Sequence, residues 1–477
     1  MIIPQEIKNI LNKLQKEGYE AYVVGGSLRD LILKKKPKDW DICTNAKPKE
    51  IQKIFPDSFY ENTYGTVTVK TQSQDLELKN IEITTYRIDE QYTDKRHPDQ
   101  VSFTSSLEED LSRRDFTVNA MASDGEKIID PFNGQVDLEK RIIKAVGKPN
   151  QRFEEDALRM IRAVRLATEL GFEIEKKTAK AIKENAGWLR AIAKERIRDE
   201  FVKMIMSPSP DRGIQISQEK GILTYIIPEL EKGVGVSQNR HHIYTIYQHA
   251  VLALKFAAER NYDLEVRLAA LLHDIAKPQT KEGEGPDSTF YNHDILGAKY
   301  AVQILNRLRF PGKVVEKVAH LVRYHMFVYD VDEVTEAGVR RLLRKVGPAY
   351  IDDLIKVRIA DRLGSGCPKA VPYKLRHLQY VIEKVSSDPI SVKMLKIDGT
   401  EIMDLLKIKP SPKIGLILSA LLSEVLDDPQ KNTKGYLNQK AQDLSQLNEK
   451  ELKTSIRKIK EKKEEVDLKM KKRYFVK

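Results

Sequence analysis

The segment Tyr22–Asp30 ends a strand-like run in a Gly-Gly pair and is followed, after eight residues, by Asp39-Trp-Asp41. The two glycines let the backbone approach a phosphate closely, and the N–H groups that open the next predicted helix favour anions. Asp39 and Asp41 lie two positions apart, so on a strand both carboxylates would leave the same face, roughly 6 to 7 Å apart. Such a pair suits hard cations such as Mg²⁺, which in a two-metal site activate a hydroxyl and hold a triphosphate leaving group. The segment predicts a nucleotide-handling metal site.

Length and composition bound the class of protein. A chain of 477 residues with 41% hydrophobic residues is expected to form about three globular domains. It has no apolar run of roughly 18 residues, and its first residues lack the pattern of a signal peptide, so we expect a cytoplasmic protein with no membrane segment. Cys43 and Cys367 lie far apart without partners at metal-ligand spacing, which argues against a disulfide scaffold and against a zinc–thiolate site.

The charge of the chain indicates a polyanionic partner. The formal net charge is +12, and lysine and arginine gain affinity for nucleic acids by displacing counterions from phosphates. Residues 449–477 contain 12 Lys or Arg against 6 Asp or Glu, so this tail carries half of the excess. A solvated helix or frayed tail and an RNA-binding arm both fit this composition.

The hydrophobic pattern changes along the chain. Up to about residue 125, strand-like runs alternate with amphipathic segments, and from about residue 140 the apolar spacing is that of helices. The strand-like runs are Ala21–Val24, Thr66–Lys70, Ile81–Tyr86 and Met121–Ser123. The clearest helical segments are Glu154–Leu170, Lys176–Asn185, Glu195–Met206 and Val266–Ala276. The pattern predicts an α+β protein whose α/β domain precedes a helical remainder.

A pair of adjacent arginines, Arg113 and Arg114, precedes the last strand-like run. Guanidinium groups stay charged and offer planar, bidentate donors, which suits a triphosphate. Asp115 and Asn119, within the same segment, can position sugar hydroxyls. A pair of surface arginines is the alternative interpretation.

Further charged residues lie on a predicted helix. Arg159, Arg162 and Arg165 recur every third residue between apolar positions, and such arginines need anionic or polar partners because burying unpaired charge is costly. Asp156 and Arg159, three residues apart, are expected side by side as an acceptor and a donor fork. This pair matches the pairing edge of cytosine or adenine, whose exocyclic amine donates and whose ring nitrogen accepts, and it mismatches uracil and guanine. An ordinary helix salt bridge is the alternative.

Together these motifs resemble the class II tRNA nucleotidyltransferases, the CCA-adding enzymes, which are relatives of bacterial poly(A) polymerases within the polymerase β superfamily. The family's Gly-Gly-x-x-Arg-Asp motif and the Asp-x-Asp that follows it match Gly25, Gly26, Arg29, Asp30, Asp39 and Asp41. The resemblance is close over residues 20–230 and looser over 240–437. It implies that Asp39 and Asp41 are the catalytic Mg²⁺ ligands. Glu82 is either a third carboxylate beside them or an ordinary strand glutamate.

The resemblance also implies a nucleotide-binding set. The family's Arg-Arg-Asp motif falls on residues 113–115, its amino-acid template on Glu155, Asp156 and Arg159, and its neck motif, which braces the template helix, on residues 195–200. The residues implied at the nucleotide are Gly26, Arg29, Arg114, Asp156, Arg159, Arg162 and Arg165.

A second metal centre is indicated in the helical part. The adjacent pair His273-Asp274 is preceded by His249 and followed by Asp361, an order that resembles the HD phosphohydrolase superfamily. The resemblance implies that these four residues bind Mg²⁺, Mn²⁺ or Ni²⁺, with His293 and His325 as possible additional ligands. Such a metal activates water for phosphoester hydrolysis. Related enzymes use the domain to hold tRNA or to remove 2′,3′-cyclic phosphates.

The implied architecture has four parts. They are a polymerase β-like nucleotidyltransferase α/β head at residues 1–140, an all-helical neck that reads the base at 141–225, an HD metal-binding body at 226–380, and a helical C-terminal tRNA-binding region with its basic tail at 381–477. The implied partners are tRNA, CTP and ATP.

Four activities fit this scaffold: complete CCA addition, C addition, A addition and poly(A) synthesis. Residues 87–102 resemble the flexible loop that full CCA-adding enzymes retain, which favours addition of the terminal A. Residues 64–69 lack the Gly-Arg-Arg/Lys-Phe element usual in the poly(A) polymerases. We therefore expect CCA addition, with poly(A) synthesis or A addition as the alternative. An RNA-binding protein with degenerate sites and an HD nucleotidase with a vestigial head are further alternatives.

Overall fold

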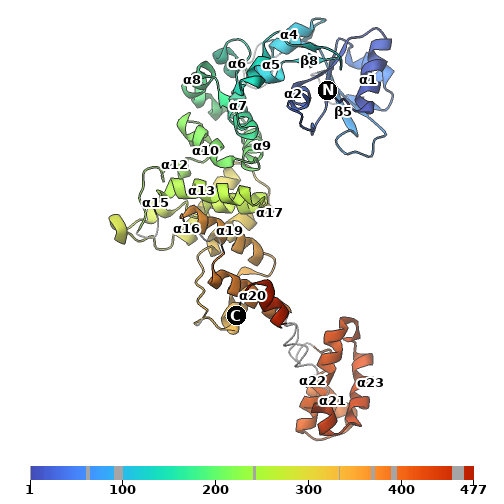
Figure 1. Ribbon diagram of the computed structural model, residues 1–477, viewed down its shortest axis with the longest axis vertical. Coiled ribbons are helices and arrows are strands. Elements are labelled where there is room, and N and C mark those ends of the chain that lie inside the picture. The colour runs from blue at the N-terminus through green and yellow to red at the C-terminus, as the bar shows by residue number, and fades with distance from the viewer. Residues whose placement is uncertain are drawn as a thin grey trace. The chain divides into compact units, whose positions relative to one another are not determined.

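A computed structural model of the chain describes residues 2–60, 65–90, 100–239, 243–331, 333–366, 371–387, 395–453 and 467–476 (Figure 1). It divides into a first unit, Met1–His325 with Asp353–Pro368, and a second unit, Met326–Asp352 with Lys369–Lys477. This coarse division groups residues 326–352 with the C-terminal region, whereas the sequence-based division put them in the HD body; the four-part division stays a prediction. No helix among the described residues is both long and apolar enough to cross a membrane.

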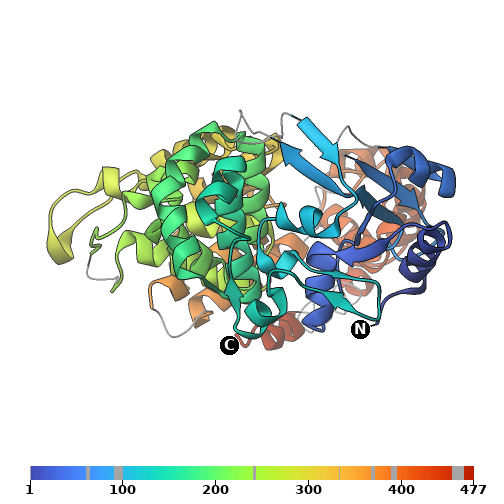
Figure 2. The same cartoon turned by 90° about the horizontal axis from the view of Figure 1, so that it is seen from above.

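The head contains a seven-stranded mixed sheet, drawn mainly in blue in Figure 2. Its order is β3 (Ser58–Tyr60), β4 (Thr66–Lys70), β5 (Asn80–Thr85), β2 (Asp41–Thr44), β1 (Ala21–Val24), β8 (Ala122–Ser123) and β9 (Ile128–Ile129). Strands β2 and β5 are parallel, and the other neighbours are antiparallel. The bounds predicted for β1 and β4 are confirmed, and β5 is shifted from its prediction by one residue. Strands β6 (Arg87–Glu90) and β7 (Gln100–Phe103) pair antiparallel in a separate two-stranded sheet.

The two faces of the sheet differ in polarity. Val23, Ile42 and Ile83 are register neighbours on one face, and all three are buried. Helices α1 (Gln5–Lys16) and α3 (Pro48–Ile54) pack against strands of this sheet and bury their own apolar residues. Side chains alternate along a strand, so Asp41 and its register partner Glu82 lie on the other face. The sheet thus directs its acidic residues away from its apolar core.

The neck is helical, as predicted, but its central segment is broken. It consists of α6 (Pro149–Glu155), α7 (Leu158–Leu170), α8 (Lys176–Asn185), α9 (Lys194–Ile205) and α10 (Pro210–Glu219). The prediction of one helix over 154–170 is wrong, because Asp156 has extended backbone angles, φ −141° and ψ 104°. Its carboxylate accepts a hydrogen bond from the N–H of Leu158, and such side-chain bonding to the backbone competes with helix continuation.

The body is a set of packed helices. Its main members are α13 (Ile246–Glu259), α14 (Leu264–Leu272), α16 (His293–Arg307), α17 (Gly312–Tyr324) and α19 (Ile351–Gly364). Small buried residues, Ala253, Ala270 and Ala360, lie where α13, α14 and α19 meet. A Cβ on Gly364 would lie 2.9 Å from the N of Ala253. Glycine at 364 therefore allows α19 to approach α13 closely.

The regular elements described in the second unit are all helices. It contains α18 (Glu336–Val346), α20 (Tyr373–Ser387), α21 (Gly399–Leu406), α22 (Pro412–Asp427) and α23 (Lys434–Ser445). Residues 467–473 form a last helix whose Asp467 accepts a hydrogen bond from Tyr380, while Arg473 pairs with Glu383 at 3.0 Å. This end of the basic tail is thus folded against α20, whereas residues 454–466 lie outside the described part.

Candidate functional sites

The turn from β1 into α2 (Gly25–Ile32) brings backbone against Asp41. Gly25 has a φ of 68°, a conformation that strains residues with a side chain. A Cβ at this position would lie 3.1 Å from Oδ2 of Asp41 and 3.2 Å from Nη1 of Arg114. Glycine at 25 therefore permits both the turn and the close approach. Gly26, the residue predicted at the nucleotide, lies beside the guanidinium of Arg29.

The two aspartates do not share a strand, which corrects the sequence prediction. Strand β2 begins at Asp41, and Asp39 lies in an exposed bend before it. The pairing of Val24 with Asp41 is the last between β1 and β2, because the chain leaves the sheet at Gly25. The two charges nevertheless interact. Burial raises the pKa of Asp41, Asp39 raises it further, and Arg114 opposes the shift.

Glu82 lies directly beside Asp41 in the sheet. The parallel register of β2 and β5 pairs the two residues, and paired residues of neighbouring strands direct their side chains to the same face. Glu82 is exposed, and because of this register its carboxylate lies on the same face of the sheet as that of Asp41. This geometry fits a third acidic ligand, which remains a prediction.

A pocket of about 270 Å³ is lined in part by Asp41. Its lining residues are Gly25, Gly26, Asp41, Arg113, Arg114, Asp115, Asn119, Asp156, Arg159, Arg162 and Arg196. Asp110, fully buried, pairs with Arg113 at 2.6 Å and with Arg114 at 3.2 Å. Sequence reasoning missed Asp110, although its spacing of three and four residues from the arginines on a helix was a usable signal.

A chain of hydrogen bonds connects the head to the neck. Arg29 donates to the side-chain oxygen of Asn119 at 2.9 Å, and Asn119 donates to Asp115 at 3.1 Å. Asp115 accepts two further bonds from Arg162, at 2.9 and 2.7 Å. Burial opposes ionisation of Asp115, but Arg162 outweighs it and holds the pKa of Asp115 far below its usual range. Both residues are therefore charged partners at the pocket.

Arg165 occupies a different environment from the other predicted nucleotide residues. Its Nε lies 2.6 Å from Oε2 of Glu200, and its Nη1 lies 2.8 Å from Oε2 of Glu169. Glu200 is buried and also lies 3.5 Å from Arg162. Arg165 is absent from the residues that line the described pocket. Its geometry is that of a brace between α7 and α9, and its nucleotide contact stays a prediction.

The predicted base-reading pair lines the pocket, but each member has its own partner. Asp156 pairs with Arg196 of α9 at 2.7 Å. Arg159 donates to Glu155 at 2.6 Å and to the carbonyl of Arg113 at 2.9 Å. Their expected placement on one continuous helix is wrong, because the backbone breaks at Asp156. Arg196 lies in the neck motif at residues 195–200, which the resemblance implies braces the template helix, but it was not predicted as a site residue.

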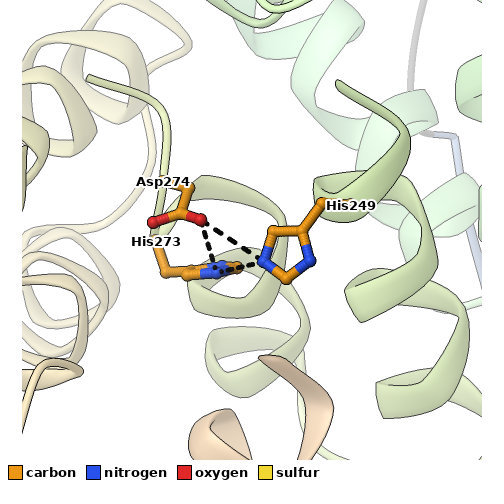
Figure 3. Close-up of side chains that lie close together, drawn as sticks. All are labelled: His249, His273 and Asp274. Carbon is orange, nitrogen blue, oxygen red and sulfur yellow. Dashed lines mark hydrogen bonds and ion pairs between the residues drawn. The ribbon is translucent and has the colours of Figure 1, made fainter. Parts of the chain in front are cut away.

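Three residues of the HD motif form a tight group (Figure 3). The two Nε2 atoms of His249 and His273 are 2.9 Å apart, and each lies 3.3 Å from Oδ2 of Asp274. All three side chains are buried, and their ligand atoms lie close enough together to hold one metal ion. Burial opposes protonation of His249, but Asp274 and Asp361 raise its pKa to about 9.

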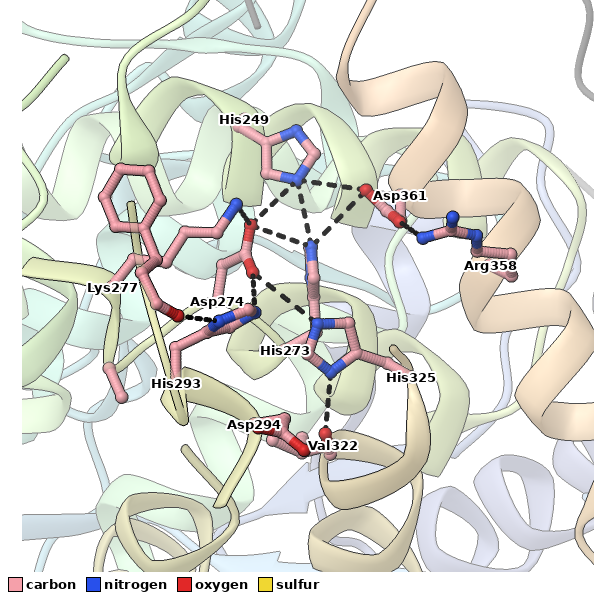
Figure 4. A network of polar contacts seen from close by, with 12 residues as sticks. His249, His273, Asp274, Lys277, His293, Asp294, Val322, His325, Arg358 and Asp361 are labelled. Atoms are coloured by element: carbon pink, nitrogen blue, oxygen red, sulfur yellow. Dashed lines mark hydrogen bonds and ion pairs between the residues drawn. The ribbon is translucent and has the colours of Figure 1, made fainter. Parts of the chain in front are cut away.

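A second group shares Asp274 (Figure 4). The other carboxylate oxygen, Oδ1, lies 3.4 Å from Nε2 of His293 and 3.7 Å from Nε2 of His325. These two nitrogens are buried and have no hydrogen-bond partner among the described residues. On each of these rings Nδ1 bonds a backbone carbonyl, of Phe290 or Val322. Such bonds fix Nε2 as the free acceptor, which is the form that binds a metal.

Asp361 reaches the first group from α19. Its Oδ1 lies 3.4 Å from Nε2 of His249, and its Oδ2 accepts a bond from Arg358 at 2.8 Å. Lys277 lies 2.7 Å from Oδ2 of Asp274. All four predicted HD residues thus converge, together with both additional histidines. The structure identifies candidate metal-binding groups and leaves the metal unspecified.

Comparison with known proteins agrees with this geometry. Three family models match: "Poly A polymerase head domain" over residues 21–144, "Probable RNA and SrmB-binding site of polymerase A" over 171–233, and "HD domain" over 246–365. A CCA-adding enzyme of Limosilactobacillus reuteri is 33% identical over 440 residues, which are 91% of this chain and 96% of that protein. The chain belongs to the tRNA nucleotidyltransferase family that includes the CCA-adding enzymes.

Other members of the tRNA nucleotidyltransferase family align over different lengths. A CCA-adding enzyme of Lactobacillus johnsonii is 48% identical over 215 residues, 45% of this chain, so the match spans about half (53%) of that relative. An A-adding tRNA nucleotidyltransferase of Deinococcus radiodurans is 36% identical over 68% of this chain and 76% of its own. The crystal structure of the Bacillus stearothermophilus CCA-adding enzyme with CTP has a TM-score of 0.61 and 28% identity, covering 93% of this chain and 98% of that one. The predicted α+β fold, with its α/β head and helical HD body, is confirmed.

Proposed function

We propose that the chain adds C, C and A from CTP and ATP to the 3′ end of tRNA without a nucleic-acid template. One observation carries the proposal: a single pocket is lined by the carboxylate of Asp41, by the guanidinium groups of Arg113 and Arg114, and by the pair Asp156 and Arg159. The carboxylate suits a metal ion, the two arginines suit a triphosphate, and the pair of Asp156 and Arg159 suits a base. The family relatives named as CCA-adding enzymes, and the solved relative that holds CTP, support this choice of substrates.

The acidic residues fit Mg²⁺. Asp41, Asp39 and Glu82 offer only oxygen ligands, which Mg²⁺ prefers. Asp41 is a partly buried carboxylate whose pKa is raised by burial, so a cation beside it offsets the cost of its charge. When bound, Mg²⁺ supplies activation of the tRNA 3′-hydroxyl and charge neutralisation at the triphosphate.

The arginines bind the triphosphate. Arg113 and Arg114 are held by the buried Asp110 and both line the pocket, where their planar guanidinium groups suit phosphate oxygens. The low pKa of Asp115, caused by Arg162 against the effect of burial, keeps that carboxylate charged and fixes Arg162 at the pocket wall. Arg29, fixed by Asn119, lies beside the Gly25–Gly26 turn.

Asp156 and Arg159 select the base. The carboxylate of Asp156 accepts from the exocyclic amine of cytosine or adenine, and a guanidinium N–H of Arg159 donates to the ring nitrogen. Uracil and guanine present a carbonyl and a ring N–H there, so they leave polar groups unpaired. Such mismatches are costly in a desolvated pocket.

Stepwise nucleotide incorporation tests the function. tRNA lacking its last three nucleotides is incubated with CTP alone, ATP alone, or both, and the products are sized. CCA addition predicts two additions with CTP and a third once ATP is present. Addition only to tRNA that already ends in CC would identify an A-adding enzyme, as the Deinococcus relative is named. Long A tails on unrelated RNA would identify a poly(A) polymerase. The segment resembling the flexible loop lies largely at residues 91–99, outside the described residues.

We also propose a metal-dependent phosphohydrolase activity for the HD centre. The observation that favours it is that Asp274 joins two candidate ligand groups, one with His249 and His273 and one with His293 and His325. Two bound cations would supply an activated water and polarisation of a phosphoryl oxygen. Hydrolysis of a 2′,3′-cyclic phosphate by protein loaded with Mg²⁺, Mn²⁺ or Ni²⁺ tests this. Loss of that hydrolysis in His273→Ala, with unchanged nucleotide addition, would support it. We propose a cytoplasmic location for both activities.

A further inference from the structure

A further pocket in the head, of about 750 Å³, is separate from the pocket of about 270 Å³ beside Asp41. It is lined by the end of α2, by the segment that leads into β2 and by parts of residues 75–78, and the two pockets share no lining residue. Small-molecule sites have volumes of about 300 to 1,000 Å³. The larger pocket therefore has room for a ligand of its own.

The wall of this larger pocket is mostly apolar. Trp40 is 4% exposed and Leu78 is 8% exposed, so the pocket reaches the hydrophobic core of the head. Ile2, which also lines it, is 91% exposed. Covering such surface with an apolar ligand is favourable. The main apolar residues of the wall are Leu31, Ile32, Pro37, Trp40, Leu78 and Ile128.

Three consecutive lysines, Lys34, Lys35 and Lys36, line the same pocket, and all three are exposed. Lys36 is paired with Asp75 at 3.1 Å and with Glu77 at 2.5 Å. Lys34 and Lys35 form no ion pair with the part of the chain that the structure describes. The pocket thus combines an apolar wall with two positive charges that can pair with an anionic ligand.

The backbone presents these two lysines in a strained conformation. Lys34 follows the end of α2 with a φ of 58°, which strains residues other than glycine. The N–H of Lys34 donates to the carbonyl of Leu31 at 3.0 Å, and the N–H of Lys35 donates to that of Asp30 at 2.8 Å. Glycine is the usual residue at this position of such a helix end. Because strained residues are concentrated at functional sites, a lysine here indicates a use for its charge.

We propose that this pocket binds a small anionic amphiphile of the medium-chain carboxylate class. The apolar chain of the ligand lies against Trp40 and Leu78, and its carboxylate pairs with Lys34 and Lys35. A nucleobase fits the pocket less well, because the apolar wall would leave the donors and acceptors of its ring edges unpaired. The inference is independent of the proposed nucleotide addition, and its test needs no measurement of that activity.

Decanoate is the probe, and its binding is measured by titration calorimetry and by the fluorescence of Trp40. The background variant Trp188→Phe leaves Trp40 as the single tryptophan of the chain. Saturable binding to one site is expected. Hexanoate should bind at least about tenfold more weakly, because it buries less apolar surface. Decanol should bind more weakly than decanoate at low ionic strength, and added salt should reduce this difference because it screens the lysines.

The double variant Lys34→Gly with Lys35→Ala should weaken decanoate binding by about fivefold and leave decanol binding unchanged. Glycine at position 34 relieves the strained backbone, so this variant should melt no lower than wild type. Its weaker binding would then not result from unfolding. Lys49→Ala is the matched control, because Lys49 is an exposed lysine of α3 that does not line the pocket, and it should bind decanoate as wild type does.

Several results would overturn the inference. One is the absence of saturable binding at about 1 mM decanoate. Equal binding of decanol and decanoate would exclude recognition of the anion, and displacement of decanoate by CTP would place it in the pocket beside Asp41. A dimer in sedimentation that Ile128→Glu converts to a monomer would mean that a second copy of the chain covers the pocket instead.

Discussion

Gly25 and Asp41 are in such close contact that a methyl group on the first would lie 3.1 Å from Oδ2 of the second. Gly25→Ala should therefore displace Asp41 as well as strain the turn, which has a φ of 68°. Gly18→Ala is the matched control, because Gly18 has a φ of 88° but no atom within 4 Å of a Cβ. We expect both variants to lose about 1 kcal/mol of stability from the strained backbone. Only Gly25→Ala should lose nucleotide addition, by about a hundredfold. Equal activity in the two variants would contradict this.

Asp41→Asn should reduce nucleotide addition by at least about a thousandfold, because it removes a charged ligand of the proposed Mg²⁺ at the reacting phosphate. Binding of tRNA, measured by filter retention, should change little. Asp57→Asn, at an exposed position of the same head, is the control and should keep full activity. Activity of Asp41→Asn above a tenth of wild type would argue against Asp41 as a metal ligand.

Asp115→Asn should lower the free energy of unfolding by about 2 kcal/mol at neutral pH, because it removes a buried charged contact with Arg162. The folded-state pKa of Asp115 lies well below the usual value of 3.8, so this stabilisation is complete above that value and is lost as the pH falls below it. The difference between wild type and variant should therefore shrink in acid. Urea unfolding followed by the fluorescence of Trp40 and Trp188 measures it. A difference independent of pH would show that the pair does not hold Asp115 ionised.

His325→Ala should remove one bound Mn²⁺ of two, because His325 belongs only to the second ligand group. Asp274→Asn should remove both ions, since Asp274 is common to the two groups. Metal content after dialysis, measured by elemental analysis, distinguishes these outcomes. His320→Ala, on α17, whose end His325 follows directly, is the control because His320 belongs to neither group. Nucleotide addition should be unchanged in all three variants. If His325→Ala retained two ions, the shared-carboxylate arrangement would be wrong.

The local pattern of this chain predicted most of its elements. Apolar residues follow a strand-like pattern in the run that ends at Val24 and in the run at Thr66–Lys70. Both runs form strands with the predicted bounds. The order of His249, His273, Asp274 and Asp361 indicated one centre, and the structure brings all four side chains together. These features could be predicted because strand and helix periods depend on neighbouring residues. The order of the motif residues is likewise visible in the sequence.

The errors have a common physical origin. Asp39 was expected on a strand with Asp41, but β1 leaves the sheet at Gly25, so no partner in β1 extends the pairing to Asp39. Asp156 was expected on a helix with Arg159, but its carboxylate bonds the backbone of Leu158 and the helix breaks there. In both cases the hydrogen-bond partners available at the end of the element, rather than the local pattern, decided where the element stops.

The sequence by itself determined the acidic, arginine-rich and histidine motifs, the α/β head and the helical remainder, because these follow from residue type and short-range spacing. Only the tertiary structure decided which partner each charged group takes: Arg196 for Asp156, Glu200 for Arg165, and Asp274 as the carboxylate shared by two histidine pairs. Such pairings join positions distant along the chain, and their geometry depends on how whole helices pack, which short-range spacing does not specify.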